Sequence, residues 1–355
     1  MSAPSHLYAC ILAGGSGERF WPMSRARTPK HLLKLLSERT LLEETVRRVE
    51  GVVPPENVYV LTSEAQVESV RAALPWVPAG QIVAEPARRD TAPAAALATA
   101  LVRVRDPKGV LAIFPADAFI HDTGRFADQL QAAFEWAAAH ASLLTFAIMP
   151  THPSTGFGYL ELGPALGVSG PGGQFRSVGR FVEKPDLATA QGYVKSGRYA
   201  WNAGMFLWQA GAFLAEAEAH APELARFIRE FPAGDPAAYM ASRFPALPKI
   251  SVDYAILEKA ASVATLVAEF DWDDVGLWTA LPKHLTADAA GNSVRGRVVV
   301  ADSSGNIALS NGRVIALCGV KDLVVVETPD AVLVCHRDAV QDIKKLHPLL
   351  PKELL

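Results

Sequence analysis

The sequence predicts an α/β fold in which a mixed, mainly parallel sheet carries helices on both faces, followed by a small β-rich domain. Short apolar runs alternate with longer helical patterns through roughly the first 150 residues, which is the βαβ rhythm of a doubly wound sheet. Half of the 355 residues are apolar, enough for a substantial core. After Asn292 helical patterns nearly vanish and short β-rich runs follow. We therefore expect two domains, residues 1–288 and 289–355.

The first half begins with a strand, Tyr8–Ala13, that leads into a glycine-rich turn. Thr40 and Glu43 have the spacing of a capping box, which predicts a helix continuing to about Val49. Strands and helices then alternate, as βαβ units require. These later elements are predicted at Val58–Leu61, Glu64–Leu74, Gln81–Ala84, a helix capped by Asp90 or Thr91 and ending near Val104, Val110–Phe114, Phe126–Ala139 and Leu143–Ile148.

The second half is less regular. Gly163–Gly173 is polar and glycine-rich and is expected to be a surface loop, and helices from Ala212 to Lys259 are interrupted by prolines. A domain boundary is expected near Ala287–Asn292. Strands are predicted at Gly158–Leu162, Ser177–Val182, Ala203–Trp208, Arg297–Ala301, Asn306–Leu309, Val314–Cys318, Leu323–Glu327 and Ala331–His336, and helices at Asp186–Ser196 and near Ala339–Leu346.

The composition excludes several classes of partner. A formal net charge of −3 gives no whole-protein attraction to nucleic acid or to an anionic membrane. No apolar run is long enough for a signal or a membrane span, so a cytoplasmic protein is expected. Cys10, Cys318 and Cys335 lie in apolar runs without CxxC spacing, which indicates buried thiols in a reducing compartment.

The glycine-rich turn is the first candidate site. Gly14, Gly15 and Gly17 directly follow a predicted strand, and such a loop lets backbone N–H groups approach phosphate oxygens. From residue 18 to residue 34 there are five Lys or Arg residues and one acid, so Arg19 and Lys30 are candidates to bind a triphosphate. The alternative is a plain turn followed by solvated basic residues.

The same loop departs from two common nucleotide-binding motifs. No GK[ST] follows the glycines, so it is not a Walker P-loop. Phe20 occupies the place of the third glycine of a dinucleotide fingerprint, which disfavours a nicotinamide-dependent oxidoreductase.

Asp117 follows a predicted buried strand, where ligands bind in open α/β sheets. A carboxylate there suits Mg²⁺ or another divalent cation that bridges phosphates, and Asp274 in the acidic run Asp271–Asp274 offers a second ligand. The alternative for Asp117 is an ordinary turn or cap residue.

Two short polar segments are candidates for binding a sugar phosphate. Glu183 could accept hydrogen bonds from sugar hydroxyls, and Lys184 could contact a phosphate. Asn202 could present its amide to the sugar. The alternative for both segments is a surface turn.

Segments in a fixed order along nearly the whole chain carry a resemblance that is jointly very specific. They are LAGGSGERFWPMSRARTPK, AEPARRDTAPAAALA, FPAD, TGFGYLE, FVEKP, WNAGMFLW, SVDYAILEK, DWDDVGLW, GVKDLVVVETPDAVLV and DIKKL. In these segments the chain resembles the nucleotidyltransferases that make sugar nucleotides, most closely the mannose-1-phosphate guanylyltransferases (GDP-mannose pyrophosphorylases).

The resemblance implies a Rossmann-like catalytic domain and a short left-handed β-helix-like domain. It implies that Arg19 and Lys30 are catalytic, that Asp117 and Asp274 carry Mg²⁺, and that Glu85 faces a guanine base. The implied nucleotide-binding residues are Leu12, Ala13, Gly14, Gly15, Ser16, Gly17, Glu85, Arg89, Thr91 and Pro115, and the implied sugar-phosphate residues are Gly158, Glu183, Lys184 and Asn202. The alternative for Glu85 is an ion pair with Arg88 or Arg89.

Three positions depart from the family pattern. Ala118 stands where the family often has His, His31 where Gln is common, and Asp90 where Asn is common, so Asp90 is expected to be a helix cap only. The fused phosphomannose isomerase domain of longer relatives is missing, so isomerase activity is not expected.

The expected reaction is in-line attack of a sugar-phosphate oxygen on the α-phosphorus of GTP, with mannose 1-phosphate as acceptor and pyrophosphate as leaving group. Two alternatives remain open: the same transfer to another sugar 1-phosphate, such as a manno-heptose or glucose, and a non-catalytic homologue that binds sugar nucleotide and regulates a partner. A homodimer is one assembly that the resemblance allows.

Overall fold

The computed structural model describes residues 6–15, 17–167 and 173–355. The larger part of the fold contains the strands β1 (Leu7–Ala13), β2 (Val58–Ser63), β3 (Ile82–Glu85), β4 (Val110–Pro115), β5 (Leu143–Ile148), β6 (Gly158–Ala165), β7 (Gln174–Glu183), β8 (Tyr199–Gln209) and β9 (Val263–Val267). Its helices are α1 (Leu41–Glu50), α2 (Val67–Ala73), α3 (Thr91–Arg105), α4 (Thr123–Ala139), α5 (Leu187–Ser196), α6 (Ala210–His220), α7 (Pro222–Glu230) and α8 (Ala237–Arg243).

The strands form one sheet in the order β3-β2-β1-β4-β8-β5-β9-β7-β6. The pairings β3-β2-β1-β4 and β5-β9 are parallel, whereas β8 and β7 run against their neighbours. All other strands of this sheet therefore point the same way. The predicted mixed, mainly parallel α/β sheet is confirmed.

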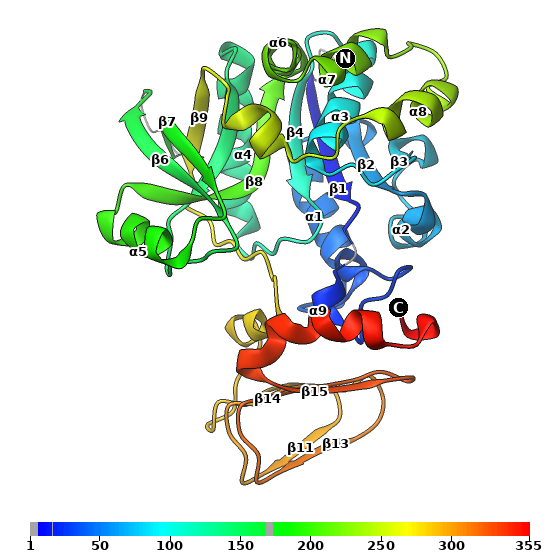
Figure 1. Cartoon of the computed structure of the whole chain (residues 1–355), viewed down its shortest axis with the longest axis vertical. Helices are drawn as coiled ribbons and strands as arrows, with labels where there is room; N and C mark the ends of the chain where they lie inside the picture. The colour runs from blue at the N-terminus through cyan, green and yellow to red at the C-terminus, as the bar shows by residue number, and fades with distance from the viewer. Residues whose placement is uncertain (1–5, 16, 168–172) are drawn as a thin grey trace.

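Helices cover both faces of the sheet (Figure 1). Tyr8 and Cys10 of β1 point into a core shared with α3, α6 and α7, whereas Ala9 and Ile11 point into a core shared with α1, α2 and α4. Successive side chains of a strand face opposite sides, so a strand covered on both sides is apolar throughout. This explains the continuous apolar run at the start of the chain. No helix in the described ranges combines the length and the apolar character needed to cross a membrane.

Local capping signals have the predicted geometry. The Thr40 hydroxyl accepts a hydrogen bond from the Glu43 backbone N–H at 3.1 Å, and the Thr40 N–H donates to the Glu43 carboxylate at 2.7 Å. Both bonds of the capping box are therefore formed at the start of α1. Asp90 caps α3 by accepting from the Thr91 N–H at 2.7 Å, as expected for that departure from the family pattern.

Several predictions for the second half need correction. The predicted loop begins as strand, because β6 continues to Ala165, which pairs with Arg176; residues 168–172 lie outside the described ranges. Strand β9 was not predicted, although it lies between β5 and β7. The expectation of three buried thiols holds for Cys10 alone, because Cys318 is exposed and Cys335 is partly exposed.

The smaller part of the fold is β-rich and lies below the large sheet in Figure 1. Its strands are β10 (Ser293–Arg295), β11 (Val298–Ala301), β12 (Ile307–Leu309), β13 (Ile315–Cys318), β14 (Leu323–Glu327) and β15 (Val332–His336). The parallel pairings β10-β12-β14 and β11-β13 stack successive coils of the chain. Cys318 is exposed because side chains alternate along β13. The predicted closing helix is a 3-10 segment, Arg337–Asp342, followed by a short α9 (Ile343–Leu346).

A buried asparagine pair links three coils of this domain. The side-chain N–H groups of Asn306 donate to Asn292 at 2.8 Å and to the Val320 carbonyl at 3.2 Å. The Asn306 side-chain oxygen accepts from the Leu323 N–H at 2.9 Å. Asn292 and Asn306 are both fully buried, so these bonds satisfy side-chain polar atoms that are shielded from water.

We predict that Asn306→Ala lowers the free energy of unfolding by about 1–3 kcal/mol, because it removes the acceptor of the Leu323 N–H and the side-chain donor to Asn292. Urea denaturation measures this, with the exposed Asn311→Ala as the matched control, expected within about 0.5 kcal/mol of the parent. Equal stabilities of the two variants would contradict a structural role for the asparagine pair.

Candidate active site

A cavity of about 640 Å³ opens at the carboxyl ends of β1, β3, β4 and β7. Most residues predicted to bind substrates line it, namely Leu12, Gly14, Gly15, Gly17, Arg19, Lys30, Glu85, Arg89, Thr91, Pro115, Asp117, Gly158, Glu183, Asn202 and Asp274. Ala13 lies instead in the core behind β1, and Lys184 lines a neighbouring cavity. Ser16 lies outside the described residues. Segments far apart in sequence thus meet around one space.

The glycines after β1 allow close approach. Gly17 has φ +66°, and a Cβ there would lie 2.4 Å from the Cβ of Lys30. A Cβ on Gly14 would lie 3.2 Å from a carboxylate oxygen of Glu85. Gly17 is therefore required both by its left-handed backbone and by the packing of Lys30.

Lys30 is buried, and its ammonium group joins three segments. It donates to the Asp117 carboxylate at 2.8 Å and to the Asp274 backbone carbonyl at 2.5 Å. It also lies 5.7 Å from the ring centre of Phe20, a distance suited to a cation–π contact. The positive charge thus lies beside both predicted metal ligands.

The two carboxylates influence each other. Burial raises the pKa of Asp274; the nearby Lys30 opposes this shift, whereas Asp273 and Asp117 add to it. Enclosure would also raise the pKa of Asp117, but the Lys30 ammonium more than offsets it, so that pKa lies below its ordinary value. A divalent cation would relieve this crowding of negative charge.

Backbone contacts bring Asp117 and Asp274 together. Phe119 and Asp273 exchange hydrogen bonds of 2.8 and 3.0 Å. The Asp271 carboxylate accepts from the N–H groups of His121 and Asp122 at 2.9 and 2.7 Å. The acidic run is thereby bound to the segment that follows β4.

Asp273 holds the turn that presents Asp274, a role that sequence reasoning missed. Its carboxylate accepts from the Val275 N–H at 2.7 Å, forms an ion pair with Lys283 at 3.1 Å and lies 3.3 Å from the His284 ring. Val275 is buried with φ +45°, a strained value for a β-branched residue. Burial opposes ionisation, but the close contact with the His284 ring and the hydrogen bonds from the Val275 N–H and the Lys283 ammonium lower the pKa of Asp273 to about 2. The charged carboxylate therefore stabilises a strained turn next to the site.

Glu85 lies at the end of β3 and lines the cavity. Burial raises its pKa to about 7. Two predicted neighbours are bound to the segment that leads to residue 252: Arg89 donates to the Pro245 carbonyl, and the Thr91 hydroxyl accepts from the Val252 N–H at 2.9 Å. Arg88, the neighbour of Arg89 in the same segment, is exposed and also lines the cavity.

At the opposite end, Glu183 is the last residue of β7 and faces Gly158 across the β6–β7 pairing. A Cβ on Gly158 would lie 2.5 Å from a Glu183 carboxylate oxygen, so a side chain there would displace Glu183. Lys184 has φ +47° and forms a 2.7 Å ion pair with Glu183. The opposite charges that the sequence placed side by side are therefore in contact.

Asn202 lies within β8, although the sequence placed it before a strand. Its side chain accepts from the Thr145 hydroxyl at 2.7 Å and donates to Asp253 at 3.1 Å. Burial, followed by the charge of Glu183, raises the pKa of Asp253 to about 7. Asp253 lines the cavity. It lies in a segment that carried the family resemblance, but nothing in the sequence shows its proximity to Glu183.

The other departures from the family pattern are buried beside the site. Ala118 can donate no side-chain hydrogen bond, so a histidine role at that position is absent. Burial lowers the pKa of His31 to about 4, which keeps its ring neutral beside Lys30.

The chain is similar to known proteins along nearly its whole length. The sequence profile of the Nucleotidyl transferase family matches residues 8–290, and that of the MannoseP isomerase/GMP-like beta-helix domain matches residues 296–348. The mannose-1-phosphate guanylyltransferase of Escherichia coli K12 is 37% identical over 97% of this chain and 73% of its own length. The xanthan biosynthesis protein XanB of Xanthomonas campestris is 38% identical over 96% of this chain and 73% of its own.

A solved structure from Thermus thermophilus, described as a mannose-1-phosphate geranyltransferase, superposes with a TM-score of 0.88. It is 33% identical and covers 97% of this chain and 99% of that one.

Proposed function

The chain belongs to the nucleotidyl transferase family, among its mannose-1-phosphate guanylyltransferases, and we infer that it transfers GMP from GTP to α-D-mannose 1-phosphate. The products are GDP-mannose and pyrophosphate. The observation that carries this conclusion is one cavity lined by the glycine-rich loop, Lys30 and two carboxylates at one end, and by Glu183 and Asn202 at the other. The sequence likeness to guanylyltransferases over nearly the whole chain supports the choice of substrates.

The direct test is a pyrophosphate-release assay with four nucleoside triphosphates and several sugar 1-phosphates. We expect the highest kcat/KM with GTP and mannose 1-phosphate. A strong preference for glucose 1-phosphate or a manno-heptose 1-phosphate would support nucleotidyl transfer but assign a different sugar substrate. Binding of sugar nucleotide without turnover would favour a regulatory homologue.

We propose that the side chains act mainly through charge and position. The sugar phosphate is already an anion, so its attack on the α-phosphorus requires no strong general base. Arg19 and Lys30 would offset the repulsion between two anions and stabilise charge on the leaving pyrophosphate. Glu183 and Asn202 would orient the sugar, and Glu85 would accept hydrogen bonds from guanine N–H groups.

A divalent cation fits the residues at the triphosphate end. The described residues contain no cluster of three or more metal-binding side chains, so Asp117 and Asp274 would form a two-carboxylate site. Mg²⁺ keeps several waters and commonly uses one or two carboxylates together with phosphate oxygens. We therefore propose that Asp117 and Asp274 hold Mg²⁺, which neutralises phosphate charge when bound. Cytoplasmic location and a homodimer remain predictions.

We predict that Asp274→Asn abolishes turnover while the fold survives, because one of two cation ligands loses its charge. Steady-state assays with titrated Mg²⁺ and thermal unfolding measure the two effects, and calorimetry should show weaker Mg²⁺ binding in the presence of GTP. Near-normal activity of the variant, or full parent activity in excess EDTA, would remove the proposed site.

Substitutions of Glu183 and Lys184 are predicted to have different kinetic effects. Glu183→Gln should lower kcat/KM for mannose 1-phosphate by roughly 10- to 150-fold, equivalent to about 1.5–3 kcal/mol, with little change in the KM for GTP. Lys184→Ala should also lower kcat, because its charge offsets repulsion as the anions meet. Varying each substrate in turn tests this, with exposed Lys195→Ala as the control. A rise in the KM for GTP alone would contradict the placement.

The pKa of Glu85 predicts a pH dependence of GTP binding. The carboxylate form accepts from guanine, and its fraction falls as pH drops through about 7. From pH 7.5 to pH 5.5 the affinity for GTP should fall roughly tenfold or more. Calorimetry on the parent and on Glu85→Gln separates this effect from titration of the phosphates, because the Gln variant cannot lose that charge. Parallel pH profiles of the two proteins would exclude Glu85 as the guanine acceptor.

A further inference from the structure

The C-terminal domain packs against the loop that carries Arg19 and Lys30, residues 17–36, which we call the triphosphate loop. Phe20, Trp21 and Leu35 of this loop lie in one hydrophobic core with Ile307 and Val326 of the C-terminal domain. Phe20 is 1% exposed, and Leu35, Ile307 and Val326 are fully buried. The core between the two parts of the chain is therefore also the support beneath the loop.

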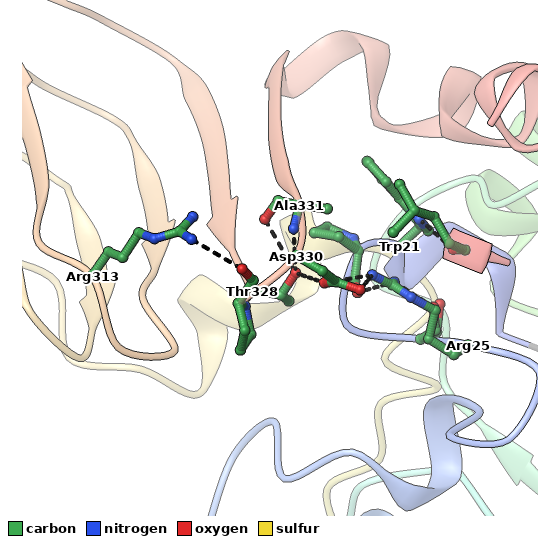
Figure 2. A network of polar contacts seen from close by, with 10 residues as sticks. Trp21, Arg25, Arg313, Thr328, Asp330 and Ala331 are labelled. Atoms are coloured by element: carbon green, nitrogen blue, oxygen red, sulfur yellow. Dashed lines mark hydrogen bonds and ion pairs between the residues drawn. The ribbon is translucent and has the colours of Figure 1, made fainter. Parts of the chain in front are cut away.

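Polar contacts join the same two parts (Figure 2). The Arg25 guanidinium donates to both carboxylate oxygens of Asp330, at 3.1 and 3.3 Å. The Trp21 indole N–H donates to the Leu354 carbonyl at 3.0 Å. Arg295 donates to the Leu35 carbonyl at 2.7 Å. The loop is thus bound to the C-terminal domain near its middle and near its end.

Each partner of the Arg25–Asp330 contact is held in place from its own side. Arg25 also donates to the backbone carbonyls of Pro22 and Ser24. The Asp330 carboxylate accepts from the Thr328 hydroxyl at 2.8 Å, and Figure 2 shows Arg313 reaching toward the same turn. Because Arg25 and Asp330 are each held by neighbours in their own part of the chain, the contact between them fixes the position of the triphosphate loop relative to the C-terminal domain.

We propose that the C-terminal domain positions the triphosphate loop for catalysis, with Arg25 and Asp330 as positioning residues. This rests on the proposed function, in which Arg19 and Lys30 act on GTP. Between Arg19 and Lys30 the loop forms a turn, in which the backbone groups of Arg25 and Thr28 exchange hydrogen bonds of 2.9 and 3.1 Å. A shift of this turn therefore moves the segment that connects Arg19 to Lys30.

The proposal has a consequence that separates the two substrates. Glu183 and Asn202 stand on β7 and β8 and are not members of the core shared with the C-terminal domain. Loosening the loop therefore affects GTP, whereas mannose 1-phosphate keeps its contacts.

The solvent exposure of Asp330 limits the expected effect of its substitution on GTP affinity. The Asp330 side chain is 52% exposed, and a cavity of about 270 Å³ lies along the contact. Water and salt therefore screen the ion pair, and one substitution is expected to change GTP affinity only about threefold to fivefold.

The experiment compares Asp330→Ala, Asp330→Asn and Asp330→Glu in the full chain. The matched control is Arg297→Ala, which removes a guanidinium–carbonyl contact within the same domain but away from the loop. The measurements are kcat, the KM of each substrate, GTP affinity by calorimetry without sugar phosphate, and thermal unfolding. We expect Ala and Asn to raise the KM and Kd for GTP about threefold or more, with the KM for mannose 1-phosphate unchanged. Asp330→Glu keeps the charge, so its KM and Kd for GTP should lie within about twofold of the parent values.

Three results would overturn the proposal. The first is unchanged GTP kinetics and affinity in Asp330→Ala, with or without a lower unfolding temperature. The second is an equal rise in both KM values. The third is a defect in Asp330→Glu as large as that in Asp330→Ala. Should Asp330→Ala unfold, Asp330→Asn, which keeps the size of the side chain and removes its charge, provides the same comparison. A parent protein that turns over no substrate pair would instead defeat the proposed function.

Discussion

The arrangement of the candidate site depends on the buried ammonium of Lys30. It binds the Asp117 carboxylate and the Asp274 carbonyl, so one cation ties the triphosphate loop to the end of β4 and to the acidic run. Without that positive charge, the nearby carboxylates of Asp117 and Asp274 would repel each other more strongly. The same charge that organises the free site is the one suited to a triphosphate. Structural and chemical requirements therefore coincide at this residue.

The strained turn beside Asp274 extends this dependence to the protein core. Val275 has φ +45° and packs in the same hydrophobic core as Phe20, Trp278 and Ile307. A β-branched residue keeps such a backbone only where packing and hydrogen bonds leave no alternative. The Asp273 carboxylate provides the hydrogen bond, and the shared core provides the packing. The β-rich domain is therefore part of the support of the site rather than an independent appendage.

Most elements of the large sheet were predictable because their signals are local. The Thr40–Glu43 capping box, the Asp90 cap and the apolar run of β1 each depend on residues within a few positions of one another. Strand β9 escaped because five residues, Val263–Val267, carry no turn signal that separates them from the preceding helical region. Asn202 was placed outside β8 because the predicted strand began at Ala203 instead of Tyr199. These errors arise where a strand is defined by its partners rather than by its own pattern.

The sequence by itself determined the fold class and the glycine-rich turn after β1, because these follow from periodicity and residue chemistry. The polar residues expected in the cavity came mainly from the resemblance to a known family. Only the tertiary structure decided which groups meet and what their environment does to them. Asp253 reaches Asn202 across 51 positions, and Asp271 caps a segment 150 positions earlier. The raised pKa values of Glu85 and Asp253 likewise exist only after folding, since desolvation is a property of the assembled core and not of the residue.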